Sequence, residues 1–382
     1  MSADARRAVP TERLEGGVSD PRPIDGVLLV SFGGPRGPGD VMPFLEKVTA
    51  GRGVPRERLE LVAEHYLARG GVSPINAETE ALVARLREEL ASRGRDDVGV
   101  YLGNRNWPPL LGEALEQAAA EGRRHLAVVL TSAYSGYSSC RQYRENVAEA
   151  LTAVAGQGGD TPQLSFVRPW GLEPEVVSAW ARLAAPATRA ALDALGAERD
   201  EEQASAQARL VFVAHSIPES AARTAGPPGN GGAYVREVRQ VCAQVAALLE
   251  PQVGARLEWS LAYCSRSGPP SVPWLEPDIS DELAALAGQG VRSVACVPVG
   301  FVADHMEVAQ DLDTVAAADA ARLGIAWHRA PTLRDDPQVA ARLTGLALAA
   351  GESPAVCPAG CCAPIGRPGA PPPERSAAFE GP

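Results

Sequence analysis

Short, almost wholly apolar runs alternate with longer amphipathic stretches in this chain, and the alternation limits the folds it can adopt. One run, residues 27–30, leads into the turn SFGGP at 31–35, and another, residues 210–214, leads into HSIP at 215–218. Strands that are apolar along their whole length suit a parallel sheet covered by helices on both faces. Because the pattern occurs twice, the sequence predicts an α/β protein with two halves of similar build.

The same alternation gives the expected positions of individual elements. Strands are expected at residues 27–30, 98–102, 125–131, 210–214, 256–262 and 291–299. Helices are expected at residues 40–48, 56–68, 77–90, 106–121, 234–249, 280–287 and 304–323. Residues 1–24 are polar and residues 346–382 are rich in Pro, Gly and Cys, so both are expected to be tails. Two domains remain, residues 25–160 and 161–345, with a solvated insertion at about residues 197–208.

Composition and charge argue against several classes of protein. The 382 residues are 45% hydrophobic, which is enough for the cores of two domains. A net charge of -11 argues against binding nucleic acid through a general positive field. The first residues lack the apolar core of a secretory signal, and no stretch approaches the length of a membrane span. We therefore expect a cytoplasmic protein without a transmembrane anchor.

His215 is the first candidate for a chemical role. It follows an apolar run and precedes Ser-Ile-Pro, so it is expected at the end of a strand. In open parallel sheets, ligands bind at the carboxyl ends of the strands. An imidazole titrates near neutral pH and can accept a proton or ligate a metal. The alternative is a histidine that only caps a strand or packs locally.

A group of acidic residues forms the second candidate. Asp304, Glu307, Asp311 and, more loosely, Asp313 recur at helical spacing just after an expected buried strand. Residues four apart share one face of a helix, so Glu307 and Asp311 are expected to form an acidic line. Carboxylate oxygens suit a divalent cation that must be passed on and not retained. The alternative is a solvated helix face with Asp304 as its N-cap.

Five ordered motifs, over roughly residues 25–340, resemble those of ferrochelatases. They are SFGGP at 31–35, GGVSPIN at 70–76, AHSIP at 214–218, SRSGP at 265–269 with PWL at 273–275, and VGFVADHME at 299–307. The resemblance implies two pseudo-symmetric Rossmann-like domains of chelatase type, with a porphyrin in the cleft between them. It also implies an enzyme that inserts ferrous iron into the porphyrin, with His215 and Glu307 as catalytic residues. Both would contact the iron, and Asp311 would extend an acidic path for it.

The resemblance further implies which substrate is used and where it binds. Coproporphyrin III is expected and protoporphyrin IX is the alternative; the two differ by two propionates. Phe32, Arg52, Ser73 and Tyr143 are the candidate substrate contacts. Many bacterial relatives have Tyr where Phe32 stands, so here we expect packing on the ring without an oxygen ligand to iron. Relatives often have an arginine where Ala50 stands, which weakens one expected propionate contact. Transient contacts with neighbouring haem-pathway enzymes are also implied.

Two rival functions remain open from the sequence. A cobalt chelatase of an early corrinoid pathway shares the fold and would need a second histidine at the metal centre. His305 is the nearby candidate, but it belongs to the ferrochelatase-like motif. A haem-binding carrier is the non-catalytic alternative, and it would not need an acidic helix face beside His215.

The cysteines suggest a bound metal. Seven cysteines in a chain expected to lie in a reducing compartment are poor candidates for disulfides. Cys357, Cys361 and Cys362 lie in the expected tail, and with Cys140 they supply four thiolates. Four such ligands suit a [2Fe–2S] cluster or a zinc site. Some ferrochelatases carry a cluster with this division of ligands, so a [2Fe–2S] cofactor is expected, with zinc or free thiols as alternatives.

Overall fold

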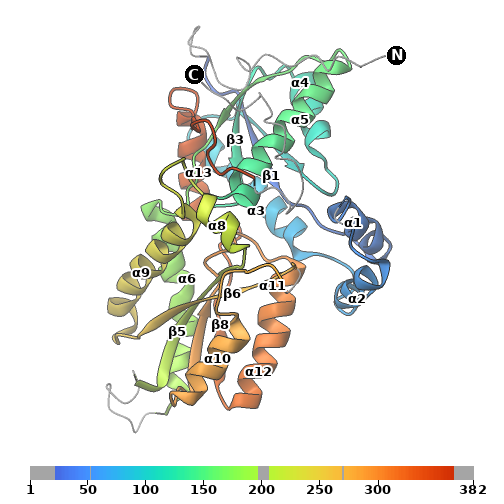
Figure 1. Cartoon of the computed structure of the whole chain (residues 1–382). Helices are drawn as coiled ribbons and strands as arrows, with labels where there is room; N and C mark the ends of the chain where they lie inside the picture. Colours follow the sequence, from blue (N-terminus) through green and yellow to red (C-terminus); the bar gives the residue numbers. More distant parts are fainter. Residues whose placement is uncertain (1–21, 52, 197–205, 269–270, 365–382) are drawn as a thin grey trace.

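The computed structural model describes residues 22–51, 53–196, 206–268 and 271–364, which form two sheets with their helices (Figure 1). Arg52, most of the expected N-terminal tail and most of the expected insertion lie outside the described residues. So does the end of the expected C-terminal tail, from residue 365.

Both sheets are wholly parallel and have the same strand order. The first contains, in spatial order, β2 (Gly99–Asn104), β1 (Gly26–Ser31), β3 (His125–Leu130) and β4 (Gln163–Phe166). The second contains β6 (Trp259–Cys264), β5 (Ala208–His215), β7 (Ser293–Val297) and β8 (Ala326–Arg329). In each sheet the first strand along the chain lies between the second and the third. The predicted α/β fold with two similar halves is confirmed, while the exact domain division remains a prediction.

The helices follow the strands in both halves. In the first they are η2 (Pro38–Asp40), α1 (Val41–Val48), α2 (Arg56–Leu67), α3 (Pro74–Ser92), α4 (Leu111–Ala120), η3 (Tyr137–Arg141), α5 (Gln142–Gly156) and α6 (Pro174–Asp193). In the second they are α8 (Glu219–Thr224), α9 (Ala233–Val253), α10 (Ile279–Gly288), α11 (Met306–Gln310), η4 (Asp311–Ala316), α12 (Ala317–Leu323) and α13 (Pro337–Ala349). None of the helices within the described ranges is long and apolar enough to cross a membrane.

Alternate residues of each central strand enter different cores, as the period of two along a strand requires. In β1, Val27 and Leu29 join the largest apolar cluster, whereas Leu28 and Val30 join a second one with α4 and α5. The largest cluster also contains one face of β5 and residues of α6, α9 and α13, so it runs through both halves. The two halves are therefore packed on a shared apolar core.

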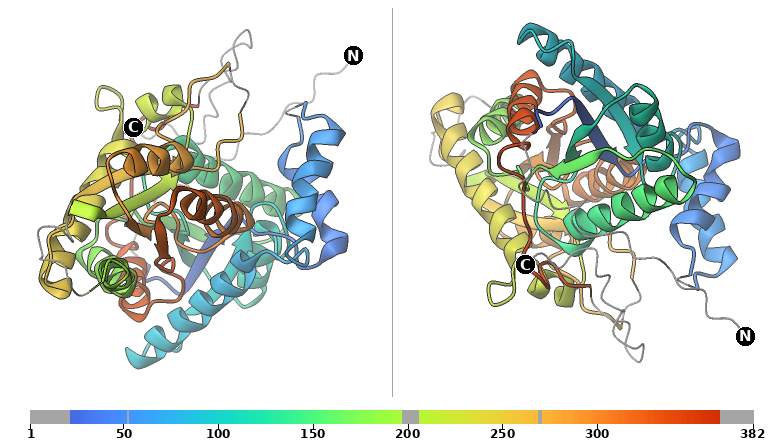
Figure 2. Two further views of the ribbon diagram at one scale, coloured as in Figure 1. Left: turned by 90° about the horizontal axis from the view of Figure 1, so that it is seen from below. Right: turned by 90° about the horizontal axis from the view of Figure 1, so that it is seen from above.

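Two helical segments lie away from the sheet that precedes them in the chain. The C-terminal helix α13 packs on α3, α6 and β3, so the chain returns to the first half after completing the second (Figure 1). Helices α1 and α2 pack together and lie at one side of the molecule in all three views (Figures 1 and 2). Their apolar residues Phe44 and Tyr66 cluster with Met306 of α11, so this pair contacts the second half.

Three sequence-based expectations need correction. The expected helix at residues 304–323 is three segments, α11, η4 and α12, and η4 is a π-helix. The expected helix at residues 106–121 begins only at Leu111, because the successive prolines Pro108 and Pro109 disfavour helical backbone before it. The expected set of elements is also incomplete, since it lacks helices α5, α6, α8 and α13 and strands β4 and β8. Tertiary contacts decide these points more than local periodicity does.

Candidate active site

The imidazole of His215 lies beside the carboxylate of Glu307. His215 is the last residue of β5, and Glu307 lies in the first turn of α11, which follows β7. The Nε2 atom of His215 is 3.6 Å from an Oε2 atom of Glu307. The other ring nitrogen, Nδ1, is 2.5 Å from the carbonyl oxygen of Ser216. Two segments far apart in the sequence thus meet at the carboxyl ends of neighbouring strands, where the sequence predicted them.

The surroundings of His215 favour its protonated form. Burial by itself lowers the pKa of His215, because a charged ring loses its water. The hydrogen bond and negative charge of Glu307 outweigh burial, so the pKa of His215 is raised, and the charge of Asp311 adds to the effect. The hydroxyl of Tyr234 donates to the backbone oxygen of His215 at 2.8 Å and anchors the strand end.

Asp311, the first residue of η4, lies against the end of a third strand. The hydroxyl of Ser265, directly after β6, donates to the Oδ2 atom of Asp311 at 2.8 Å. Burial raises the pKa of Asp311, and the charge of Glu307 contributes in the same direction. His215, Glu307 and Asp311 therefore lie at the carboxyl ends of three adjacent strands, β5, β6 and β7.

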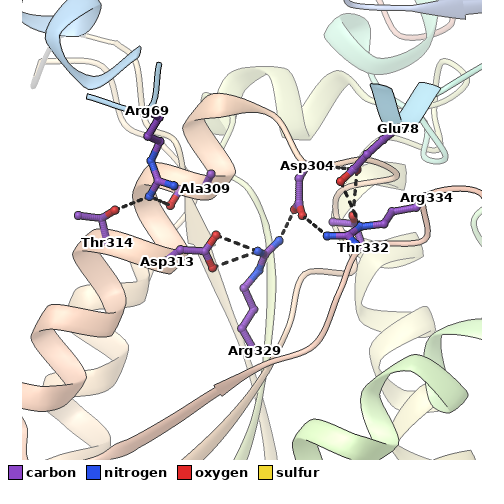
Figure 3. A network of polar contacts seen from close by, with 9 residues as sticks. All are labelled: Arg69, Glu78, Asp304, Ala309, Asp313, Thr314, Arg329, Thr332 and Arg334. Carbon is purple, nitrogen blue, oxygen red and sulfur yellow. Dashed lines mark hydrogen bonds and ion pairs between the residues drawn. The ribbon is translucent and has the colours of Figure 1, made fainter. Parts of the chain in front are cut away.

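The four acidic residues at helical spacing are divided into two pairs, and Figure 3 shows the outer one, Asp304 and Asp313. Arg329 on β8 forms ion pairs with both Asp304 and Asp313, at 3.0 Å for Asp313. Glu307 and Asp311 lie instead toward His215. This arrangement agrees with the expected line of Glu307 and Asp311, whose role stays a prediction, whereas Asp304 and the more loosely spaced Asp313 are paired with Arg329.

Phe32 follows β1 and has a largely apolar setting. Its ring is 37% exposed and meets the edge of Phe44, with ring centroids 6.3 Å apart. The guanidinium carbon of Arg105 lies 5.7 Å from the centroid of Phe32 and 4.3 Å from that of Tyr143. Tyr143 itself is buried. The sequence did not single out Arg105, although the strand-end rule could have found it directly after β2.

Ser73 is buried where two of the sequence motifs pack together. A Cβ atom added to Gly34 would lie 2.6 Å from the Cβ of Ser73, so only glycine fits there. The Asn76 side chain accepts from the amide of Gly34 at 3.2 Å and donates to its carbonyl at 2.8 Å. The motifs at 31–35 and 70–76 therefore support each other, and a role for Ser73 in substrate binding stays a prediction. The fourth candidate contact, Arg52, lies outside the described residues.

His305, the histidine that a cobalt chelatase would use, packs on an aromatic ring. Its imidazole and the ring of Phe301 form an edge contact at 5.4 Å. Burial lowers the pKa of His305. Over the described ranges, no three His, Cys, Asp or Glu side chains are grouped so as to hold a metal ion.

The four predicted cysteines lie together. Cys140, in η3, contacts Cys357; Cys357 contacts Cys361; and the sulfurs of Cys361 and Cys362 are 3.9 Å apart. Thiol hydrogen bonds from Cys140 and Cys361 lower the pKa of Cys357. The four cysteines that the sequence grouped as ligands thus lie near one another, and their binding of a metal stays a prediction. The remaining cysteines, Cys242, Cys264 and Cys296, are buried elsewhere.

The C-terminal cysteine segment, residues 355–363, is held by both halves. The amide of Ala355 donates to the carbonyl of Phe166 at 2.8 Å. Arg141 donates to the carbonyl of Cys361 at 3.1 Å. Cys362 donates its amide to the carbonyl of Gly226 at 2.9 Å. Hydrogen bonds to backbone groups of both halves therefore hold this segment in place.

Comparison with known proteins places this geometry in context. The family model described as Ferrochelatase matches residues 24–350. A coproporphyrin III ferrochelatase from Streptomyces griseus is 44% identical over 363 residues, covering 90% of this chain and 94% of that protein. One with the same description from Nocardia farcinica is 46% identical and covers 91% and 99% of the two chains. The family match ends before Cys357.

Among solved structures, SirB from Bacillus subtilis with Fe3+ is similar at 14% sequence identity and a TM-score of 0.42. The alignment covers 86% of this chain and 96% of that one.

Proposed function

The chain belongs to the ferrochelatase family, and on that premise we propose that it inserts Fe²⁺ into coproporphyrin III as a step of haem biosynthesis. The observation that carries the proposal is the contact between His215 and Glu307, 3.6 Å apart at two strand ends. That pair lies within the region matched by the family model. The names of the relatives support coproporphyrin III over protoporphyrin IX.

His215 is proposed as the base that accepts one pyrrole proton, and the carboxylates of Glu307 and Asp311 as the groups that receive the other. A free-base porphyrin loses two N–H protons as iron enters, so the site needs an acceptor near the ring. The Nδ1–H group of His215 can donate to the carbonyl of Ser216, which leaves the lone pair on Nε2. Glu307, beside Nε2, then stabilises the imidazolium, in keeping with the raised pKa of His215.

Glu307 and Asp311 are proposed as the oxygen ligands that receive the substrate iron. Carboxylates bind Fe²⁺ without the permanence of thiolates, so the metal can be transferred. Arg329 neutralises Asp304 and Asp313, which leaves the inner pair as the acidic groups that lie toward His215. Ser265 orients the Asp311 carboxylate through both its hydroxyl and its backbone amide.

Phe32, Ser73 and Tyr143 remain proposed substrate contacts, and Arg52 lies outside the described residues. The exposed face of Phe32 is suited to packing on a porphyrin ring. Arg105, stacked between Phe32 and Tyr143, has the charge and geometry to bind a propionate. Ser73 and Tyr143 are buried, which suits support of the neighbouring backbone and of Arg105.

A metal-insertion assay tests the function directly. Purified protein is mixed with Fe²⁺ or Co²⁺ and with coproporphyrin III or protoporphyrin IX, and the visible spectrum is followed. The expected result is fastest insertion of Fe²⁺ into coproporphyrin III. Faster insertion into protoporphyrin IX would show that the substrate is protoporphyrin IX and not coproporphyrin III. Preference for Co²⁺ would support the corrinoid alternative, and tight haem binding without insertion would support a haem carrier.

We further propose that Cys140, Cys357, Cys361 and Cys362 bind one [2Fe–2S] cluster. The mutual sulfur contacts bring together four side chains of the type that ligates such a cluster. Bound there, the cluster would supply four metal–thiolate bonds and a one-electron redox centre. Insertion of Fe²⁺ involves no net electron transfer, so stabilisation or redox sensing is the proposed role.

Metal analysis of protein purified without oxygen tests the cluster. A red-brown protein with about two iron and two sulfide per chain, beyond any haem, is expected. A colourless protein with one zinc per chain would show that the four cysteines bind zinc and not a [2Fe–2S] cluster.

We also propose a cytoplasmic location, since cysteines that form no disulfides are usual in a reducing compartment. Brief contacts with neighbouring haem-pathway enzymes are proposed from the family membership.

A further inference from the structure

The π-helix η4 is held from outside by Arg69, which lies just beyond the end of α2 (Figure 3). One guanidinium nitrogen, Nη2, donates to the carbonyl oxygen of Ala309 at 2.8 Å. The same nitrogen donates to the hydroxyl oxygen of Thr314 at 2.5 Å. Arg69 therefore joins the α1–α2 pair of the first half to the helix that carries Glu307 and Asp311.

The two acceptors of Arg69, Ala309 in α11 and Thr314 in η4, are five residues apart, which is the repeat of a π turn. In a π-helix the carbonyl of residue i points toward residue i+5. In an α-helix, residues five apart lie about 140° from each other around the axis. Ala309 and Thr314 can therefore share one guanidinium nitrogen in the π register, and the α register would turn Thr314 away.

The remaining contacts of Figure 3 hold the two flanks of this segment. The amide of Asp304 donates to Glu78 at 2.6 Å, and Arg334 donates to Asp304 at 3.0 Å. Arg329 joins Asp304 to Asp313. These contacts hold the start of α11 and tie it to η4 through Arg329. Among the contacts drawn in Figure 3, those of Arg69 join Ala309 to Thr314.

We propose that Arg69 is a positioning residue of the iron-insertion site, holding η4 in the π register that turns Asp311 toward Glu307 and His215. A contact made with only one of two backbone forms shifts the population toward that form. Relaxation to an α-helix would rotate Asp311 by about 100° for each residue of register change and break its bond from Ser265. The role assigned to Asp311 rests on the proposed function; the hold on η4 does not.

Amide hydrogen exchange tests the hold on η4 independently of activity. In Arg69→Ala, exchange of amides 311–316 is expected to accelerate at least about tenfold, because local opening is no longer opposed. Thr314→Val keeps the side-chain shape and removes one acceptor, so a smaller acceleration is expected. Unchanged exchange in Arg69→Ala would overturn the proposal whatever the activity.

The matched control is Arg56→Ala. Arg56 is an exposed arginine at the start of α2, the helix that ends just before Arg69, and it pairs with Glu46 and Glu60 of the α1–α2 pair. Its loss should leave exchange of amides 311–316 and insertion kinetics unchanged. Equal effects of Arg56→Ala and Arg69→Ala would assign the change to general loosening of α1 and α2, and would overturn a specific role for Arg69.

Steady-state kinetics test the positioning role. Arg69→Ala should raise the KM for Fe²⁺ or lower kcat by about tenfold, while the KM for porphyrin stays within about twofold. Arg69→Lys should restore part of the rate, because an ammonium can still reach the carbonyl of Ala309. Faster exchange with unchanged kinetics would overturn the positioning role. A wild-type protein that inserts no metal would instead overturn the proposed function, and the exchange result would still decide whether Arg69 holds η4.

Discussion

Each half of the molecule has a π-helix at the same place in its topology, after the third strand and before the helix that leads to the fourth. In the first half this is η3, which carries Cys140; in the second it is η4, which begins with Asp311. Cys140 contacts the C-terminal cysteine segment, whereas Asp311 lies with Glu307 and His215. The shared topology places a π-helix near the strand ends in both halves, and the side chains that each π-helix carries determine its chemical role.

The strand ends themselves show the same division. The central strand β1 ends at Ser31, and its counterpart β5 ends at His215. Ser31 is buried and contacts Thr79 at 3.4 Å, while His215 is partly exposed beside Glu307. Equivalent positions thus serve packing in one half and proton chemistry in the other.

The largest expected effect comes from the chemical pair of the second half. His215→Ala and Glu307→Gln should each lower iron insertion by at least about 100-fold, since each removes a proton acceptor or its partner. Circular dichroism should show an unchanged fold. Ser31→Ala, at the matching strand end, should keep activity within about threefold, and a loss comparable to that of His215→Ala would break the comparison.

Mutations in the two π-helices should affect different properties of the protein. Asp311→Asn is expected to lower turnover about tenfold while leaving cluster iron and sulfide unchanged, because η4 serves the substrate metal. Cys140→Ser should do the reverse, removing the cluster with turnover of fresh protein within about threefold. Metal analysis and the insertion assay on both variants decide this, and loss of both properties in either variant would show that the turns are coupled.

A pH profile should show the influence of η4 on His215. The base must be neutral to accept a proton, so kcat/KM should fall as the pH drops through the pKa of His215, which lies above its ordinary value of 6.5. Asp311→Asn removes one of the charges that raise this pKa, so the acid limb should move to lower pH. Cys140→Ser should leave the limb in place. A limb that moves to higher pH in Asp311→Asn would contradict the arrangement.

The smallest effect is expected at Phe32, which follows β1. Phe32→Tyr adds an oxygen on the side chain proposed to pack on the porphyrin, so the visible spectrum of the bound iron-porphyrin should shift. Turnover should stay within about threefold, because no proton acceptor changes. An unchanged spectrum with product shown to be bound would place Phe32 away from the metal.

Much of this arrangement could be predicted from local patterns. Apolar runs four or five residues long identified the central strands, and parallel strands present their carboxyl ends at one edge. That reasoning placed His215 and Glu307 near each other although more than ninety residues separate them. The contact among Cys140 and the three later cysteines followed from ligand counting and the family resemblance, and the sulfur contacts agree with it.

What local patterns could not provide were the contacts that oppose them. Residues 304–323 have helical spacing throughout, and a π turn within them depends on groups from other elements, including Arg69 and Ser265. Likewise Arg329, on β8, neutralises Asp304 and Asp313, so equal spacing did not mean equal roles. The sequence by itself determined which strands form and which side chains stand at their ends, because period and polarity are local properties. The tertiary structure decided the register of η4 and which carboxylates remain beside His215, because both depend on side chains that only folding brings near.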